Sequence, residues 1–277
     1  MQLASRFGKA SPVLRSPVPL SNDEIRSVAP SIFAEAKHDS RSERYTYIAT
    51  SEVLDGLRRE GFQPFMVAQT RVRDEAKRDH TKHMIRLRHA DQINGHEANE
   101  IILLNSHDGT SSYQMLAGMF RFVCHNGMVC GKTMDDIRIP HKGNIVHEVI
   151  EGAVRVLDSF DVAAEQRDSM EALSLNEGQQ TAFARAALAL RYEPNESGFV
   201  APVTERQILR AKRPADQKPD LWTTFNRIQE NMIKGGLSGR NANGRNVTTR
   251  AVSGIDQDIK LNRALWVLAD EMSRLIA

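Results

Sequence analysis

The chain has 277 residues, of which 40% are hydrophobic and 26% charged, with a formal net charge of +2. These values exclude a chain that is disordered throughout, and they provide enough apolar material for one large domain or two small ones. Because the sequence lacks both a long apolar run and a hydrophobic N-terminal segment, we expect no membrane span and no secretory signal, and we predict a cytoplasmic protein.

Residues 1–20 are polar and contain three prolines, which predicts an irregular N-terminal arm. Ser21 and Glu24 have the spacing of a capping box, so a short helix is predicted to begin there and to end near Pro30.

Residues 45–49 alternate in polarity and predict a strand. Thr50 is a candidate N-cap for the helix that follows, which Gly61 is expected to end.

From Phe62 to about Ile139 the dominant spacing of apolar residues becomes two, which is typical of strands. The candidate strands are FMVAQTRVR, HMIRLRHA, NEIILLN and YQMLAGMFRFVC, separated by polar breaks. The region 21–140 therefore predicts mainly an antiparallel sheet of about four strands.

Five arginines of these strands are predicted to share one basic sheet face, because side chains alternate across a strand. They are Arg71, Arg73, Arg86, Arg88 and Arg121.

The region 141–277 is predicted to be helical and to pack on the sheet, with the boundary near Pro140; the fold class is therefore α+β. Amphipathic spacing and capping residues predict helices at 145–157, with Asn144 as N-cap, and at 176–191, 204–213, 220–234 and 255–276.

Charge is unevenly distributed in this second half. Residues 151–203 contain 4 basic and 9 acidic residues, whereas residues 204–250 contain 10 basic and 4 acidic ones. A Gly/Arg-rich loop, 235–254, carries Arg240, Arg245 and Arg250 among Gly, Asn, Ser and Thr. This composition favours contact with phosphates, although a solvated linker is the plain alternative.

The two cysteines, Cys124 and Cys130, are too few for a disulfide framework. With two of His107, His125, His141 and His147 they would supply a Cys2His2 zinc set, but their spacing is unlike that of zinc fingers. We therefore predict two core cysteines, an Asn126-Gly127 hairpin turn between them, and no cofactor; zinc remains the alternative.

The segment Asn105-Ser-His-Asp-Gly109 lines up a hydroxyl, an imidazole and a carboxylate, yet neighbouring residues on an extended chain point apart, so a polar turn is predicted. We expect His80, His83, His89 and His96 to be solvated loop residues.

The runs LLNSHDGTSSYQ, FRFVCHNGMVCG, IPHKGN and WTTFNRIQENMIKGGLSGR, in this order, resemble a family of plasmid and prophage proteins, domain of unknown function 932. The likeness extends from about Tyr45 to the C-terminus. Cys124, Asn126, His141 and Asn144 match the family's usual Cys, Asn and His-Thr-x-Asn positions, but Lys142 and Gly143 stand where Thr is commoner. The resemblance implies a bacterial mobile genetic element and supplies no activity.

The leading hypothesis is a non-catalytic protein of a mobile element that binds nucleic acid, with DNA as the expected type, in recombination, maintenance or defence evasion. Its contacts would be the five sheet arginines together with Arg240, Arg245 and Arg250. Two alternatives stay open: a metal-dependent enzyme using the Cys124/His141 region, and a protein that inhibits a host factor through its acidic stretch. A homo-oligomer is compatible with all three.

Overall fold

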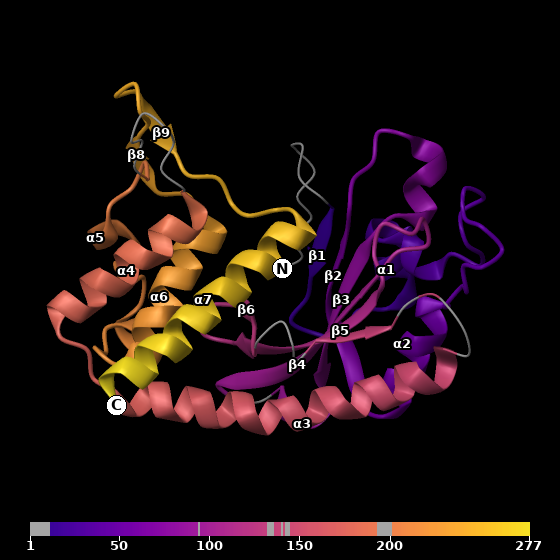
Figure 1. Ribbon diagram of the computed structural model, residues 1–277, viewed down its shortest axis with the longest axis horizontal. Coiled ribbons are helices and arrows are strands. Elements are labelled where there is room, and N and C mark those ends of the chain that lie inside the picture. The colour runs from indigo at the N-terminus through magenta and orange to yellow at the C-terminus, as the bar shows by residue number, and fades with distance from the viewer. Residues whose placement is uncertain (1–11, 94, 132–135, 140, 142–144, 193–200) are drawn as a thin grey trace. The chain divides into compact units, whose positions relative to one another are not determined.

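A computed structural model describes residues 12–93, 95–131, 136–139, 141, 145–192 and 201–277. The chain divides into two compact units (Figure 1). We call Met1–Gly127 with Thr133–Phe160 the sheet unit, and Met128–Lys132 with Asp161–Ala277 the helical unit. The α+β fold class is confirmed, with an antiparallel sheet of N-terminal strands and a C-terminal helical region. Pro140, the predicted boundary, lies outside the described residues.

The sheet has the strand order β1-β2-β3-β4-β5-β6, and β7 also pairs with β5. Its strands are β1 (Val13–Arg15), β2 (Phe62–Gln69), β3 (His83–His89), β4 (Glu97–Asn105), β5 (Tyr113–Arg121), β6 (Asn126–Val129) and β7 (Ile137–Ile139). The pairs from β1 to β5 are antiparallel, so the four strands predicted from the alternation form a meander. Residues 13–15 of the predicted irregular arm form the edge strand β1. The prolines of the arm lie outside this strand, so they remove none of its hydrogen bonds to β2.

The centre of the sheet is buried on both faces. In β4, residues 101–104 are consecutive apolar side chains that are all buried. Helices α1 (Asn22–Val28) and α2 (Thr50–Arg59) pack against β2. Because both faces of β4 are buried at its middle, its sequence there is a run of apolar residues rather than an alternation of apolar and polar ones.

Ser21 and Glu24 form the predicted capping box of α1. The next helix differs from prediction in two ways. Residues 45–49 form no strand, and Ala49 rather than Thr50 is the N-cap of α2. The Thr50 hydroxyl is buried instead, 3.0 Å from His83 Nε2 and 2.9 Å from Asn105 Nδ2.

The chain also reverses earlier than predicted between the cysteines. The turn occupies residues 122–125, and His125 adopts a positive φ of 53° while its N–H donates to the Phe122 carbonyl at 3.3 Å. Asn126 and Gly127 therefore begin β6 rather than forming the turn.

The helical unit contains the end of α3 (Ile145–Ala172) and then α4 (Glu177–Arg191), α5 (Glu205–Ile208), α6 (Leu221–Lys234) and α7 (Ile255–Ile276). The short 3-10 turns of the chain are Pro30–Phe33, Glu75–His80, Ala90–Gln92 and Pro214–Asp216. Trp222, Phe225 and Trp266 stack in the core of this unit, as their helical spacing predicts. Among the described residues, no helix combines the length and the apolar composition that crossing a bilayer requires.

Two local predictions in this unit need correction. The helix predicted for 204–213 is limited to the single turn α5. The Gly/Arg-rich loop 235–254 contains a two-stranded sheet, β8 (Ser238–Arg240) and β9 (Asn246–Thr248), which Figure 1 shows as a hairpin extending beyond the helices of its unit.

Candidate nucleic-acid interface

The predicted basic sheet face is not exposed in the structure. Arg86 and Arg88 are each 3% exposed, and both are ion-paired with Glu100, at 2.8 Å and 2.9 Å. Arg88 and Glu100 are direct partners across the β3–β4 ladder. Since a buried carboxylate that holds two guanidinium groups leaves neither available to a phosphate, this part of the expected interface is absent.

Aromatic rings complete the enclosure of Arg88. Its guanidinium carbon lies 3.4 Å from the centroid of Phe120 and 4.6 Å from that of Phe65. The backbone of Gly127 packs closely against the Arg86 guanidinium. A Cβ at position 127 would lie only 2.4 Å from that guanidinium, so the glycine leaves room for it. These arginines are therefore part of the sheet core.

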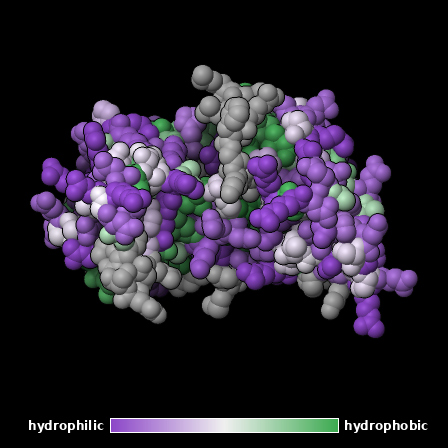
Figure 2. Space-filling model, turned by 90° about the horizontal axis from the view of Figure 1, so that it is seen from above, coloured by the Kyte–Doolittle hydropathy of each residue, from purple (hydrophilic) through white to green (hydrophobic). Residues whose placement is uncertain are grey.

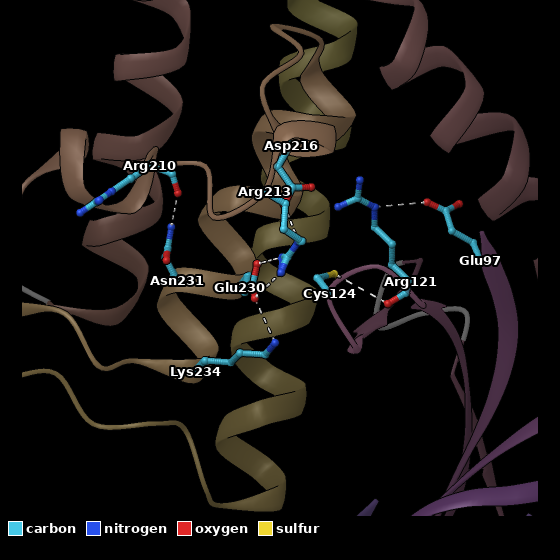
Figure 3. Close-up of polar contacts among 9 residues, drawn as sticks. All are labelled: Glu97, Arg121, Cys124, Arg210, Arg213, Asp216, Glu230, Asn231 and Lys234. Carbon is cyan, nitrogen blue, oxygen red and sulfur yellow. Dashed lines mark hydrogen bonds and ion pairs between the residues drawn. The ribbon is translucent and has the colours of Figure 1, made fainter. Parts of the chain in front are cut away.

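The other three sheet arginines are not gathered on one face. Arg121 is 9% exposed and lies 3.9 Å from Glu97, its partner across the β4–β5 ladder (Figure 3). Arg71 and Arg73 are exposed, but they follow the end of β2 at Gln69 and so lie in a loop.

The arginines of the β8–β9 hairpin have the opposite environment. Arg240, Arg245 and Arg250 are all exposed. The hairpin tip is held by Asn241, whose side-chain oxygen accepts hydrogen bonds from the backbone N–H groups of Asn243 and Arg245, both at 3.0 Å. The tip is thus an ordered turn that presents guanidinium groups to solvent.

The base of the hairpin is fixed to the rest of the helical unit. Gly239 packs so closely on Pro202 that a Cβ would lie 1.9 Å from the Pro202 carbonyl oxygen, and the Arg240 N–H donates to that oxygen at 3.0 Å. The Gln207 side chain, on α5, donates to the Ser238 carbonyl at 2.7 Å. The orientation of the hairpin on its unit is therefore determined by backbone contacts.

The acidic residues of segment 204–250 are engaged within the helical unit. Arg213 binds both Asp216, at 2.9 Å, and Glu230, and Lys234 reaches Glu230 at 3.0 Å (Figure 3). Glu205 pairs with Arg185 at 2.9 Å, and the hydrogen bond from Arg185 lowers the pKa of Glu205.

The fourth acidic residue, Asp220, is the N-cap of α6 and accepts from the Thr223 N–H at 2.7 Å. Seven basic residues of the same segment are exposed and form no ion pair with any residue that the structure describes. They are Arg206, Arg210, Lys212, Lys218, Arg240, Arg245 and Arg250.

Hydrophilic residues predominate on the face of the protein shown in Figure 2. Arg206, Arg210, Lys212 and Lys218 were not among the predicted contact residues, although the excess of basic over acidic residues in segment 204–250 could have indicated them.

The two candidate zinc-binding cysteines belong to different units, and the side chain of one candidate histidine lies outside the described residues. Cys124 is buried in the sheet unit, where its Sγ donates to the Arg121 carbonyl at 3.7 Å (Figure 3), and Cys130 is buried in the helical unit. The His147 side chain lies outside the described residues, as do Lys142, Gly143 and Asn144. Within the described part of the chain, no three His, Cys, Asp or Glu residues are arranged to hold a metal ion.

A buried polar cluster in the sheet unit escaped the sequence analysis. His83, predicted to be solvated, is fully buried between the hydroxyls of Ser31 and Thr50, at 2.9 Å and 3.0 Å. His107, from the predicted polar turn, is also fully buried, with its ring centroid 5.3 Å from that of His83. The Ser31 backbone lies close to the His107 ring, but neither ring nitrogen of His107 has a well-aligned hydrogen-bond partner among the described residues.

His141 is nearly buried, stacks on Tyr45 and places its Nδ1 2.9 Å from the Thr46 carbonyl. Burial lowers the pKa of His83 to about 3 and that of His107 to about 4, and it also lowers the pKa of His141. These imidazoles are therefore neutral at pH 7 and add no positive charge to the surface.

Comparison with known proteins gives a family and no structural template. The sequence profile of the family described as domain of unknown function (DUF932) matches residues 37–266. The UPF0380 proteins YafZ and YfjQ of Escherichia coli (strain K12) are each 58% identical to this chain over 271 residues, which cover 98% of this chain and 97% of each relative. No solved structure matches the chain.

Proposed function

The chain belongs to the DUF932 family, and from that premise we propose that it binds nucleic acid through the exposed basic residues of segment 204–250. The proposed biological setting is a plasmid or prophage, where such binding would serve recombination, maintenance or defence evasion. The proposal includes no catalytic step, and the buried sheet arginines have no part in it.

One observation carries the proposal: the acidic residues of this segment are engaged internally, while seven basic side chains are exposed without ion pairs to described residues. An exposed cation that has no local carboxylate retains its full attraction for an external anion. Since a nucleic acid presents phosphates at regular intervals, several such cations on one unit contribute together.

The chemistry of the hairpin supports the same conclusion. Arginine forms bidentate hydrogen bonds with phosphate oxygens, so the exposed guanidinium groups of the hairpin are suitable donors to a nucleic-acid backbone. Arg240 and Arg245 flank the turn that Asn241 orders, so little backbone reorganisation is needed on binding.

The test is a titration of fluorescently labelled oligonucleotides, both DNA and RNA and both single- and double-stranded, at two or more salt concentrations. The variant Arg240→Ala/Arg245→Ala/Arg250→Ala is compared with wild type. We expect binding to weaken at least tenfold and the slope of log K against log[salt] to become shallower by about 0.9 for each of these arginines that contacts a phosphate of duplex DNA.

A charge-matched control removes three exposed arginines of the sheet unit: Arg44→Ala/Arg59→Ala/Arg155→Ala. This control should bind like wild type. Equal affinity of the hairpin variant and wild type, or no salt-dependent binding of any oligonucleotide, would overturn the proposal.

A further inference from the structure

Resting on the proposed function, we infer that the preferred ligand is B-form duplex DNA and that the β8–β9 hairpin enters its major groove as a two-stranded ribbon. The major groove of B-DNA, about 12 Å wide, admits a two-stranded β-ribbon. The hairpin is such a ribbon, with Ser238 opposite Thr248 and Arg240 opposite Asn246. No described strand pairs with its outer edges, and the β8 edge makes a single backbone hydrogen bond to Pro202, from the Arg240 N–H.

Its exposed side chains are of the types that read base edges. Because alternate residues share a face and Gly239 faces Pro202, Arg240 and Asn246 lie on the opposite, exposed face. Arginine pairs with guanine and asparagine with adenine through two hydrogen bonds each in the major groove. Arg245 adds a guanidinium at the tip.

Exposed cations on α5 and directly after it would contact phosphates. Gln207 joins α5 to the hairpin through the Ser238 carbonyl, and the neighbouring Arg206 is exposed. Arg210 follows α5, and its carbonyl accepts from the Asn231 side chain while its guanidinium points away from that contact (Figure 3). When a ribbon lies in the groove, such cations can contact the phosphates and so fix the position of the protein along the duplex.

The buried aromatic residues of the helical unit disfavour single strands, and the groove geometry of RNA disfavours duplex RNA. Proteins that bind single strands stack bases on exposed aromatic rings, but Phe183, Trp222, Phe225 and Trp266 are buried, and among the described residues of the helical unit only Tyr192 has a partly exposed ring. Duplex RNA has a deep, narrow major groove that side chains cannot read. Duplex DNA is therefore the ligand that suits this hairpin.

The experiment measures anisotropy with three probes of one sequence: a 20-base-pair DNA duplex, its single strand and the same duplex in RNA. We expect wild type to bind duplex DNA at least tenfold more tightly than either other probe. The variant Arg240→Ala/Arg245→Ala should lose most of this preference, whereas Arg206→Ala/Arg210→Ala should weaken binding of all three probes by similar factors.

A melting curve for each variant confirms that these surface substitutions leave the fold intact. Binding of single-stranded DNA or duplex RNA as tightly as duplex DNA would overturn groove insertion while leaving nucleic-acid binding in place. A preference for duplex DNA that survives Arg240→Ala/Arg245→Ala would also overturn it. Failure to bind any probe would instead overturn the proposed function on which this inference rests.

Discussion

Glu100 is fully buried between two arginines, and its carboxylate is the acceptor that both share. Glu100 therefore supplies a counter-charge to both Arg86 and Arg88 in this buried site. Alternation along a strand correctly places Arg86 and Arg88 on one face, but it does not tell whether that face is wet or covered.

The substitution Glu100→Gln should destabilise the fold by about 3–5 kcal/mol, because it removes the buried carboxylate with which two buried guanidinium groups are paired. Urea denaturation followed by circular dichroism measures the loss. Glu60→Gln, at an exposed position, is the matched control and should change stability by no more than about 0.5 kcal/mol. A small effect of Glu100→Gln would show that the arginines have another acceptor.

The buried histidines make stability depend on pH. An unfolded histidine has a pKa of 6.5, whereas burial lowers the folded pKa of His107 to about 4 and that of His83 to about 3. The unfolded chain therefore binds protons first as pH falls, so stability is fully present above pH 6.5 and is lost progressively below it, down to about pH 3.

We expect wild type to lose about 3 kcal/mol from His107 alone between pH 6.5 and 4, at 1.36 kcal/mol for each pKa unit. His107→Leu should have a shallower dependence over this range, and His96→Gln, at an exposed position, should follow wild type. Urea midpoints measured at several pH values test this. Parallel curves for wild type and His107→Leu would contradict it.

Among the elements, the hairpin shows how a short β-structure escapes prediction. Its strands have three residues each, and Gly, Asn and Ser dominate its sequence, so neither alternation nor β-propensity was available as a signal. The structure supports it by contacts from elsewhere, namely the Pro202 carbonyl and the Gln207 side chain.

Gly239→Ala is therefore expected to displace the hairpin and to destabilise the helical unit by about 1–3 kcal/mol, since the added Cβ overlaps the Pro202 carbonyl. Thermal unfolding and the duplex titration report the two effects. Gly56→Ala in α2 is the control: its Cβ meets no atom closer than 3.9 Å, and helix propensity should make it neutral or stabilising by up to about 1 kcal/mol. Unchanged stability of Gly239→Ala would show that the hairpin moves freely on its base.

The small net charge of the whole molecule conceals an uneven distribution of paired and exposed charged residues. The sheet unit holds Arg86, Arg88 and Arg121 in cross-strand ion pairs, whereas segment 204–250 of the helical unit engages its four acidic residues and leaves seven basic ones exposed. A basic segment is thus present in a chain whose net charge is small.

The buried cysteines lead to a prediction about metal content. Cys124 lies in the sheet unit with its Sγ 3.7 Å from the Arg121 carbonyl oxygen, and no three His, Cys, Asp or Glu residues of the described chain are arranged to hold a metal ion. We expect elemental analysis of the purified protein to find well under one zinc per chain, and a chelator to leave the urea midpoint unchanged. Stoichiometric zinc that disappears in Cys130→Ala would contradict this expectation.

The sequence by itself determined the α+β class, the four long strands, most helices and the family, because apolar periodicity, capping residues and ordered motifs are local properties of the chain. Tertiary structure alone decided which cations remain exposed. Strand pairing brings Glu100 opposite Arg88, and chain folding buries His83 and His107. Packing of segments far apart in sequence also brings Pro202 against Gly239 and Arg213 onto Glu230. A side chain's exposure and charge partner depend on such neighbours, and no local pattern records them.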